Sequence, residues 1–171
     1  MPTNWTFPTS FNQFAEADNH IAWDSVSNYV YLRTDDGRYI KTVKSLTHVS
    51  NSSTGPRTNK TTYLLLTNFP FINLPTSISG IEVEIKIQRG GRINDDTVQL
   101  RLNDEFIGEN KANLNLELFS KYGSSTDTWA TGLTRDNLLN PNFGIGIRFQ
   151  SHLSYPHNDT PMLDYVKLRV W

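Results

Sequence analysis

Residues 80–88 read Gly-Ile-Glu-Val-Glu-Ile-Lys-Ile-Gln, and this stretch decides the fold class of the chain. Four β-branched residues, Ile81, Val83, Ile85 and Ile87, alternate with charged or amide side chains. A period of two sends successive side chains to opposite faces of a pleated strand. The stretch therefore predicts a β-strand with one face in a core and the other face in water.

The sequence on both sides of this stretch predicts more short strands and very little helix. Further strands are expected within residues 29–32, 38–46, 63–66, 97–102, 143–149 and 166–170. Prolines and polar runs separate them, the longest at residues 47–60. About eight short strands with such connections are typical of a sandwich or jelly roll. We therefore expect an all-β fold, an antiparallel β-sandwich of jelly-roll type with minimal helix.

One helical turn is expected late in the chain. Residues 134–139 read Thr-Arg-Asp-Asn-Leu-Leu, with Thr134 suited to cap the first backbone N–H groups and Asp136 placed in the first turn. Pro141 follows and would end the helix.

Residues 1–22 show poor periodicity, whereas residues 23–171 are expected to form the single sandwich domain. The first segment contains the aromatic residues Trp5, Phe7, Phe11 and Phe14. It is either a lead-in that packs these rings on its own domain or an arm that docks on a neighbouring subunit. Because interface cores are enriched in aromatic residues, these four are the candidate docking residues.

Composition excludes several classes of function. The chain has 171 residues, 16 Lys+Arg against 17 Asp+Glu, a net charge of -1 and no cysteine. Binding of nucleic acid is driven by concentrated Lys and Arg, so a nucleic-acid partner is not expected. No apolar run approaches the ~18 residues of a membrane helix, and the start of the chain lacks a signal-peptide pattern. A soluble protein made inside a cell is the expectation.

No catalytic constellation is found, so we expect no enzymatic activity and no cofactor. The adjacent pairs Asp95-Asp96 and Asp104-Glu105 would point to opposite faces of a strand, which does not suit glycoside hydrolysis. Turn formation explains them better. A metal held by His152, His157 and Asp159 is weighed against a solvated loop, and a structural calcium ion at residues 94–96 or 157–159 stays open.

The tryptophans allow two interpretations. Trp23 and Trp129 lie beside strand or turn signals and are expected in the core, where the indole N–H finds a partner. Trp5 fits either a core position or an exposed one. Exposed aromatic rings on a sandwich could stack against sugar rings, as in carbohydrate-binding modules.

Seven pieces of the sequence, in order, resemble a β-sandwich module of virion proteins from tailed bacteriophages, notably of cyanophages and marine phages. They are Ala22-Trp23-Asp24, Tyr63 to Glu84 with its Leu-x-x-x-Asn-Phe-x-Phe and Gly-Ile-x-Val-x-Ile patterns, Asp96-Thr-Val-Gln-Leu, Ile107-Gly-Glu-Asn-Lys-Ala, Tyr122-Gly123 through Trp129, Asn142-Phe-Gly-Ile, and Leu163-Asp-Tyr-Val-Lys-Leu. The resemblance covers residues 22–171. Val26 replaces a proline of the module, Ser124 and Ser125 replace its second glycine region, and the loop after Gly90 is shorter.

The resemblance implies a non-enzymatic structural protein of a bacteriophage virion, a decoration or docking module on the capsid, neck or tail. Its expected partners are other virion proteins and further copies of itself, for example in a trimer, with no nucleic acid and no membrane. It would be made in the host bacterial cytoplasm and reside in the virion. The alternative is a fibre-borne adhesin or carbohydrate-binding module that recognises a glycan of the host surface.

Overall fold

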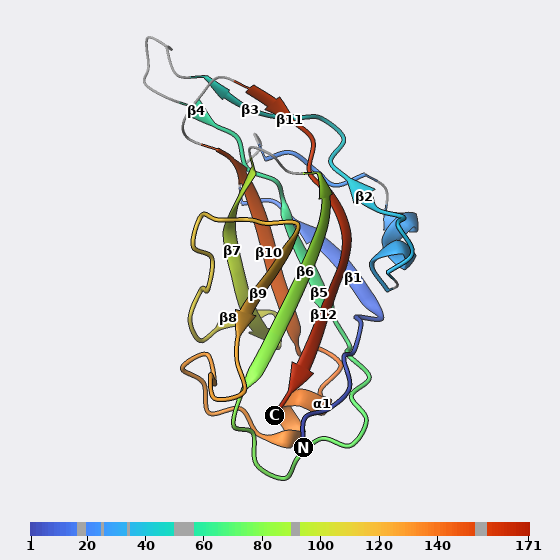
Figure 1. Ribbon diagram of the computed structural model, residues 1–171, viewed down its shortest axis with the longest axis vertical. Coiled ribbons are helices and arrows are strands. Elements are labelled where there is room, and N and C mark those ends of the chain that lie inside the picture. Colours follow the sequence, from blue (N-terminus) through green and yellow to red (C-terminus); the bar gives the residue numbers. More distant parts are fainter. Residues whose placement is uncertain (17–19, 25, 34, 50–56, 90–92, 153–156) are drawn as a thin grey trace.

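The computed structural model describes residues 1–171 except 17–19, 25, 34, 50–56, 90–92 and 153–156, and it is an all-β sandwich (Figure 1). One sheet contains, in spatial order, β1 (Ser10–Phe14), β5 (Tyr63–Thr67), β10 (Gly144–Ser151), β7 (Ile93–Leu102) and β8 (Glu105–Ile107). The facing sheet contains β2 (Ile40–Lys41), β12 (Met162–Val170), β6 (Ile81–Arg89) and β9 (Phe119–Gly123). Every pairing between these strands is antiparallel. The predicted fold class is thereby confirmed.

A smaller sheet and two short helices complete the described elements. The small sheet, in the order β11 (His157–Asp159), β3 (Leu46–Val49) and β4 (Arg57–Thr58), lies at one end of the sandwich (Figure 1). The helices are the 3-10 helix η1 (Val26–Arg33) and the α-helix α1 (Arg135–Leu139). None of the described helices is long and apolar enough to cross a membrane.

The core lies between the two large sheets and is built from the alternating positions that the sequence singled out. Ile81, Val83, Ile85 and Ile87 of β6 are buried, and they share one hydrophobic cluster with inward-facing residues of the other sheet. Those residues are Leu64, Leu66, Val98, Leu100, Ile145, Ile147 and Phe149. Burial of apolar area at about 25 cal/mol per Å² makes this layer the main source of stability.

Both tryptophans expected in the core are there. Trp23 and Trp129 are almost completely buried. The indole N–H of Trp23 donates to the carbonyl of Thr62 at 3.2 Å, and that of Trp129 donates to the carbonyl of Ile81 at 2.8 Å. Each indole N–H therefore has the partner that a buried donor requires.

The N-terminal segment is part of both sheets. Thr3 and Thr6 donate backbone N–H groups to Val170 and Leu168 of β12, each at 2.8 Å. Strand β1 then pairs along its whole length with β5 of the other sheet, from Ser10 opposite Thr67 to Phe14 opposite Tyr63. The described part of residues 1–22 is thus a lead-in that crosses from one sheet to the other and joins them along one side.

The expected helical turn is confirmed. Helix α1 begins after Thr134, whose hydroxyl accepts the backbone N–H of Asn137 while the Asn137 side chain accepts the backbone N–H of Thr134. This reciprocal pair satisfies two of the backbone donors that a helix start leaves open. Leu138 anchors the turn in the core.

Two local predictions were wrong. Residues 29–32, expected as a strand, belong to η1, which packs beside β12 and buries Leu32, because tertiary packing overrides the strand preference of Tyr and Val. The described residues also form twelve strands, more than the eight expected. The strands without a predicted counterpart are β1, β9 and the short strands β3, β4 and β11.

Candidate functional site

The four predicted docking aromatics do not form one surface. The Trp5 ring covers β12, with Arg169 at 4.5 Å and Lys167 at 4.8 Å from its centroid. Phe7 meets the Tyr165 ring edge-on at 6.0 Å between centroids. Phe11 packs against the core, and Phe14 projects from β1 on the other sheet. The structure therefore brings Trp5 and Phe7 together, where they line one hollow, and separates Phe11 and Phe14 from them.

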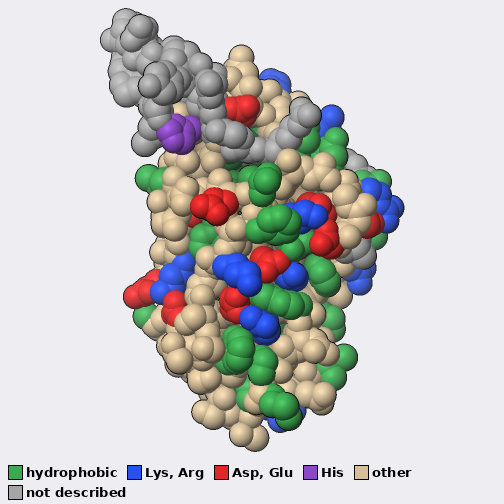
Figure 2. Space-filling model, viewed as in Figure 1, with side chains coloured by type: hydrophobic (Ala, Val, Ile, Leu, Met, Phe, Trp, Pro, Cys, Tyr) green, Lys and Arg blue, Asp and Glu red, His purple; other side chains and the backbone are tan. Residues whose placement is uncertain are grey.

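The outer face of the four-stranded sheet carries a ladder of ion pairs. Glu82 accepts from Arg169 at 2.5 Å, and Glu84 accepts from Lys167 at 2.8 Å and from the Tyr165 hydroxyl at 2.5 Å. Figure 2 shows the resulting mixture of acidic, basic and apolar side chains across this face. Burial raises the pKa of Glu84, but the bonds from Lys167 and Tyr165 outweigh burial and hold that pKa below its ordinary value.

This ladder corrects the expectation of a wet outer face on β6. Glu82 and Glu84 are each only 8% exposed, because the long side chains of the neighbouring strands and the Trp5 ring cover them. Alkyl stems of Lys and Arg commonly cover a surface while their charged ends reach a partner. The face is a closed, internally neutralised layer in the described structure.

A second charged network lies on the outer face of the five-stranded sheet. The Asp96 carboxylate accepts from Lys60 at 2.6 Å and from Arg148 at 2.5 Å, and Arg148 also donates to Glu16 at 2.5 Å. The Arg148 guanidinium stacks on the Tyr63 ring, 4.1 Å from its centroid. Burial raises the pKa of Asp96, but the bonds from Lys60 and Arg148 outweigh it and lower that pKa overall.

We predict that Asp96→Asn lowers the free energy of unfolding by about 2 kcal/mol at neutral pH, because two charged donors lose their anionic acceptor. A carboxylate whose pKa is lowered by folding adds stability above its unfolded pKa of about 3.9 and loses that contribution as the pH falls through the folded pKa. The deficit of the variant should therefore shrink below about pH 4. Urea denaturation at a series of pH values measures it.

The matched control is Asp36→Asn, which removes a carboxylate from the exposed pair with Arg38. Exposed pairs contribute at most about 1 kcal/mol, so this variant should stay close to the parent at every pH. Equal losses in both variants would contradict the assigned importance of Asp96.

The first segment considered for calcium, residues 94–96, uses its carboxylates within the protein. Asp95 is fully buried and accepts the backbone N–H groups of Asn113 at 2.9 Å and Asn115 at 2.8 Å. Within the described residues, no group of three or more His, Cys, Asp or Glu side chains could hold a metal ion. In the second segment, residues 157–159 form β11. The side chain of His157 lies outside the described part of the structure.

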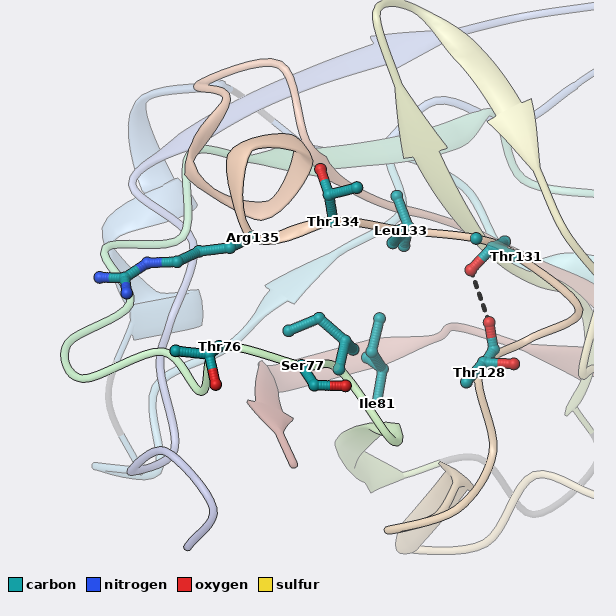
Figure 3. A pocket seen from close by; sticks show the side chains of 10 residues that line it. Thr76, Ser77, Ile81, Thr128, Thr131, Leu133, Thr134 and Arg135 are labelled. Atoms are coloured by element: carbon teal, nitrogen blue, oxygen red, sulfur yellow. Dashed lines mark hydrogen bonds between the residues drawn. The ribbon is translucent and has the colours of Figure 1, made fainter.

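A pocket of about 340 Å³ opens beside the N-terminal end of α1 and is lined largely by hydroxyl groups (Figure 3). Several of these hydroxyls serve the local backbone. The Thr131 hydroxyl donates to the Thr128 carbonyl at 2.5 Å, and the Thr134 hydroxyl belongs to the helix cap. Arg135 points away from the other labelled side chains (Figure 3). The pocket therefore offers few side-chain groups that converge on one ligand.

A hollow of about 400 Å³ on the outer face of the five-stranded sheet combines aromatic and polar groups. Leu65 of β5 is part of its lining, with Asn12 and Phe14 from β1 and Arg101, Asp104 and Phe106 from the β7–β8 hairpin. Arg101 is only 7% exposed; one of its terminal N–H groups donates to the Asp104 carbonyl at 2.5 Å, while its buried Nε has no partner. This hollow is the candidate ligand site, because concave sites characteristically join apolar walls to a few placed polar groups.

Among the residues of this hollow, sequence reasoning named only Phe14 as a binding candidate, and it assigned Asp104 to a turn. Arg101 and Phe106 were missed, although they lie opposite each other across the turn expected at Asp104-Glu105. Cross-strand partners project from the same face, so the turn could have indicated this pair. Their proximity to Phe14 depends on the order of five strands, which no local pattern contains.

Comparison with known proteins gives no relative. The chain matches no protein-family model, no curated protein and no solved structure at a significant level.

Proposed function

We propose that the protein is a non-enzymatic structural component of a tailed-bacteriophage particle, held in place by contacts with other particle subunits. The observation that carries the proposal is the location of the resemblance in the fold. Five of its seven pieces overlap β5, β6, β7, β9, β10 and β12, which are strands of the two large sheets. The resemblance therefore concerns the residues that build the domain and not a single motif.

The exposed apolar residues before and within β9 offer a docking surface for such contacts. Leu114, Leu118 and Phe119 are all exposed and lie within six residues at the edge of the four-stranded sheet. An edge strand with exposed apolar side chains is a ready contact for another chain. The salt-bridged charges of the neighbouring face would frame that contact with a polar surround.

A double variant, Leu118→Ser with Phe119→Ser, tests the surface in particles that encode the protein. We expect it to fold normally, because both side chains are exposed, and to be retained in purified particles at least about ten-fold less than the parent. Quantitative mass spectrometry of the particles gives the copy number, and cryo-electron microscopy gives the position.

Val43→Ser is the matched control, since Val43 and Leu118 are both 57% exposed and Val43 lies beyond β2, at the opposite edge of the sheet. Retention of this control with loss of the double variant supports docking through β9. Particles that contain no copy of the parent protein would refute the structural role itself.

A further inference from the structure

The hollow over the five-stranded sheet has the composition of a sugar-binding site. Two phenylalanine rings, Phe14 and Phe106, belong to its lining, and both are in contact with Tyr63. The Phe14 ring stacks on Tyr63 at 6.4 Å with an interplanar angle of 17°, and Phe106 lies 5.1 Å from Tyr63. Because Phe14 is 54% exposed, part of its ring remains free for a ligand. The apolar C–H face of a pyranose ring packs well on such a surface.

The polar side chains supply both donors and acceptors at one place. The Asp104 carboxylate accepts hydrogen bonds, the Asn12 amide can donate, and the Arg101 guanidinium has N–H groups in excess of its one protein acceptor. A planar carboxylate, amide or guanidinium group can bond two neighbouring hydroxyls of one sugar at the same time. A ligand rich in hydroxyl groups would therefore satisfy donors and acceptors of this hollow together.

The charges in the hollow are balanced. The positive charge of Arg101 faces the negative charge of Asp104 in the same lining, and Glu16 is already paired with Arg148. The charges of Arg101 and Asp104 offset each other, so neither an acidic nor a cationic ligand would gain a net electrostatic attraction in this hollow. The charge pattern therefore favours a neutral ligand over either ion.

Gly146 in the central strand β10 keeps the Phe106 ring in its place. A Cβ atom at this position would lie 2.4 Å from the Phe106 ring, closer than any real contact. A side chain here would push the ring outward into the hollow. Because Gly146 has no side chain, the Phe106 ring can lie close to the backbone of β10.

We propose that this hollow binds a neutral pyranose of a polysaccharide, with Phe14 and Phe106 stacking on the sugar and Asp104, Arg101 and Asn12 bonding its hydroxyls. This activity goes beyond the structural role and does not depend on it. A particle protein with such a site would adhere weakly to a glycan-coated surface through each copy. Many copies would add their contributions through multivalency.

The test uses the purified full chain and a panel of neutral oligosaccharides (maltoheptaose, cellohexaose, mannohexaose and galactohexaose), with an alginate hexamer as the acidic probe. Titration followed by ¹H–¹⁵N NMR should show micromolar-to-millimolar binding of at least one neutral probe, with shifts in β1 and the β7–β8 hairpin. Phe14→Ala and Asp104→Asn should each weaken that binding by about ten-fold or more. Both positions are exposed, so both variants should fold.

Tyr39→Ala is the control, because Tyr39 is an exposed aromatic residue that directly precedes β2 of the opposite sheet. It should bind the sugar as the parent does. Failure of every neutral probe to bind up to millimolar concentration would overturn the proposal. Exclusive binding of alginate, or neutral binding that Phe14→Ala and Asp104→Asn leave unchanged, would overturn it as well.

Discussion

Removal of residues 1–14 is expected to lower the free energy of unfolding by more than about 5 kcal/mol, enough to unfold a domain of ordinary stability. The deletion removes all of β1 and exposes the edge of β5, and it also takes away the backbone bonds of Thr3 and Thr6 to β12. Phe11 leaves the core with them. Circular dichroism and urea denaturation of the truncated chain measure the loss.

Deletion of residues 1–2 alone is the control, because Met1 and Pro2 are exposed and the first backbone bond to β12 comes from Thr3. This shorter deletion should cost less than about 0.5 kcal/mol. A truncation of residues 1–14 that unfolds at the same urea concentration as the parent would show that the segment is an accessory arm. Residues 1–14 would then be free to dock on another subunit, which is the second interpretation that the sequence allows.

Replacement of Trp129 by alanine should cost about 5 kcal/mol, the second largest effect that we expect. The side chain is fully buried. Truncation of a buried tryptophan to alanine leaves a large cavity and lowers the free energy of unfolding by about 3–5 kcal/mol. The Ile81 carbonyl also loses the indole donor that lies 2.8 Å away, which adds about 1 kcal/mol or more. Equilibrium urea denaturation gives the total.

Two further variants separate these contributions. Trp129→Phe keeps most of the ring volume but cannot donate to Ile81, so it should lose about 1–2 kcal/mol. Trp5→Ala removes a partly exposed ring of the same type from the ion-pair ladder and should lose about 1 kcal/mol. A loss at Trp129→Ala no larger than that at Trp5→Ala would contradict the assigned role of Trp129 in the core.

The sequence predicts the strands of the sandwich where alternation is strict, and the start of α1 where the cap residue is explicit. The β6 pattern from Ile81 to Ile87 and the Thr134 cap are local signals, and both were confirmed. Helix η1 was missed because its Tyr-Val-Tyr-Leu run favours a strand, and only packing beside β12 decides otherwise. The burial of Glu82 and Glu84 depends in the same way on side chains of neighbouring strands, which a single strand pattern does not contain.

The candidate sugar site was even less accessible to sequence reasoning. Phe14 and Phe106 are separated by 92 positions, and neither has a distinctive local motif. They meet because β1, β5, β10, β7 and β8 are neighbours in that order. Strand order depends on long-range pairing, so the aromatic content of the chain could suggest a sugar-binding face but could not locate it.

The pairing of Thr3 with Val170 has a consequence for how the molecule acquires its structure. These residues are 167 positions apart in the chain and form a hydrogen bond at the side of the sandwich. Strand β12 also pairs with β6 in the middle of the four-stranded sheet. Contacts of such high sequence separation slow folding, because a long loop must close before they can form. During synthesis the two sheets cannot be joined until the segment around Val170 has left the ribosome. Until then the edge of β6 that pairs with β12 stays open, and an unpaired strand edge is a site at which nascent chains can aggregate.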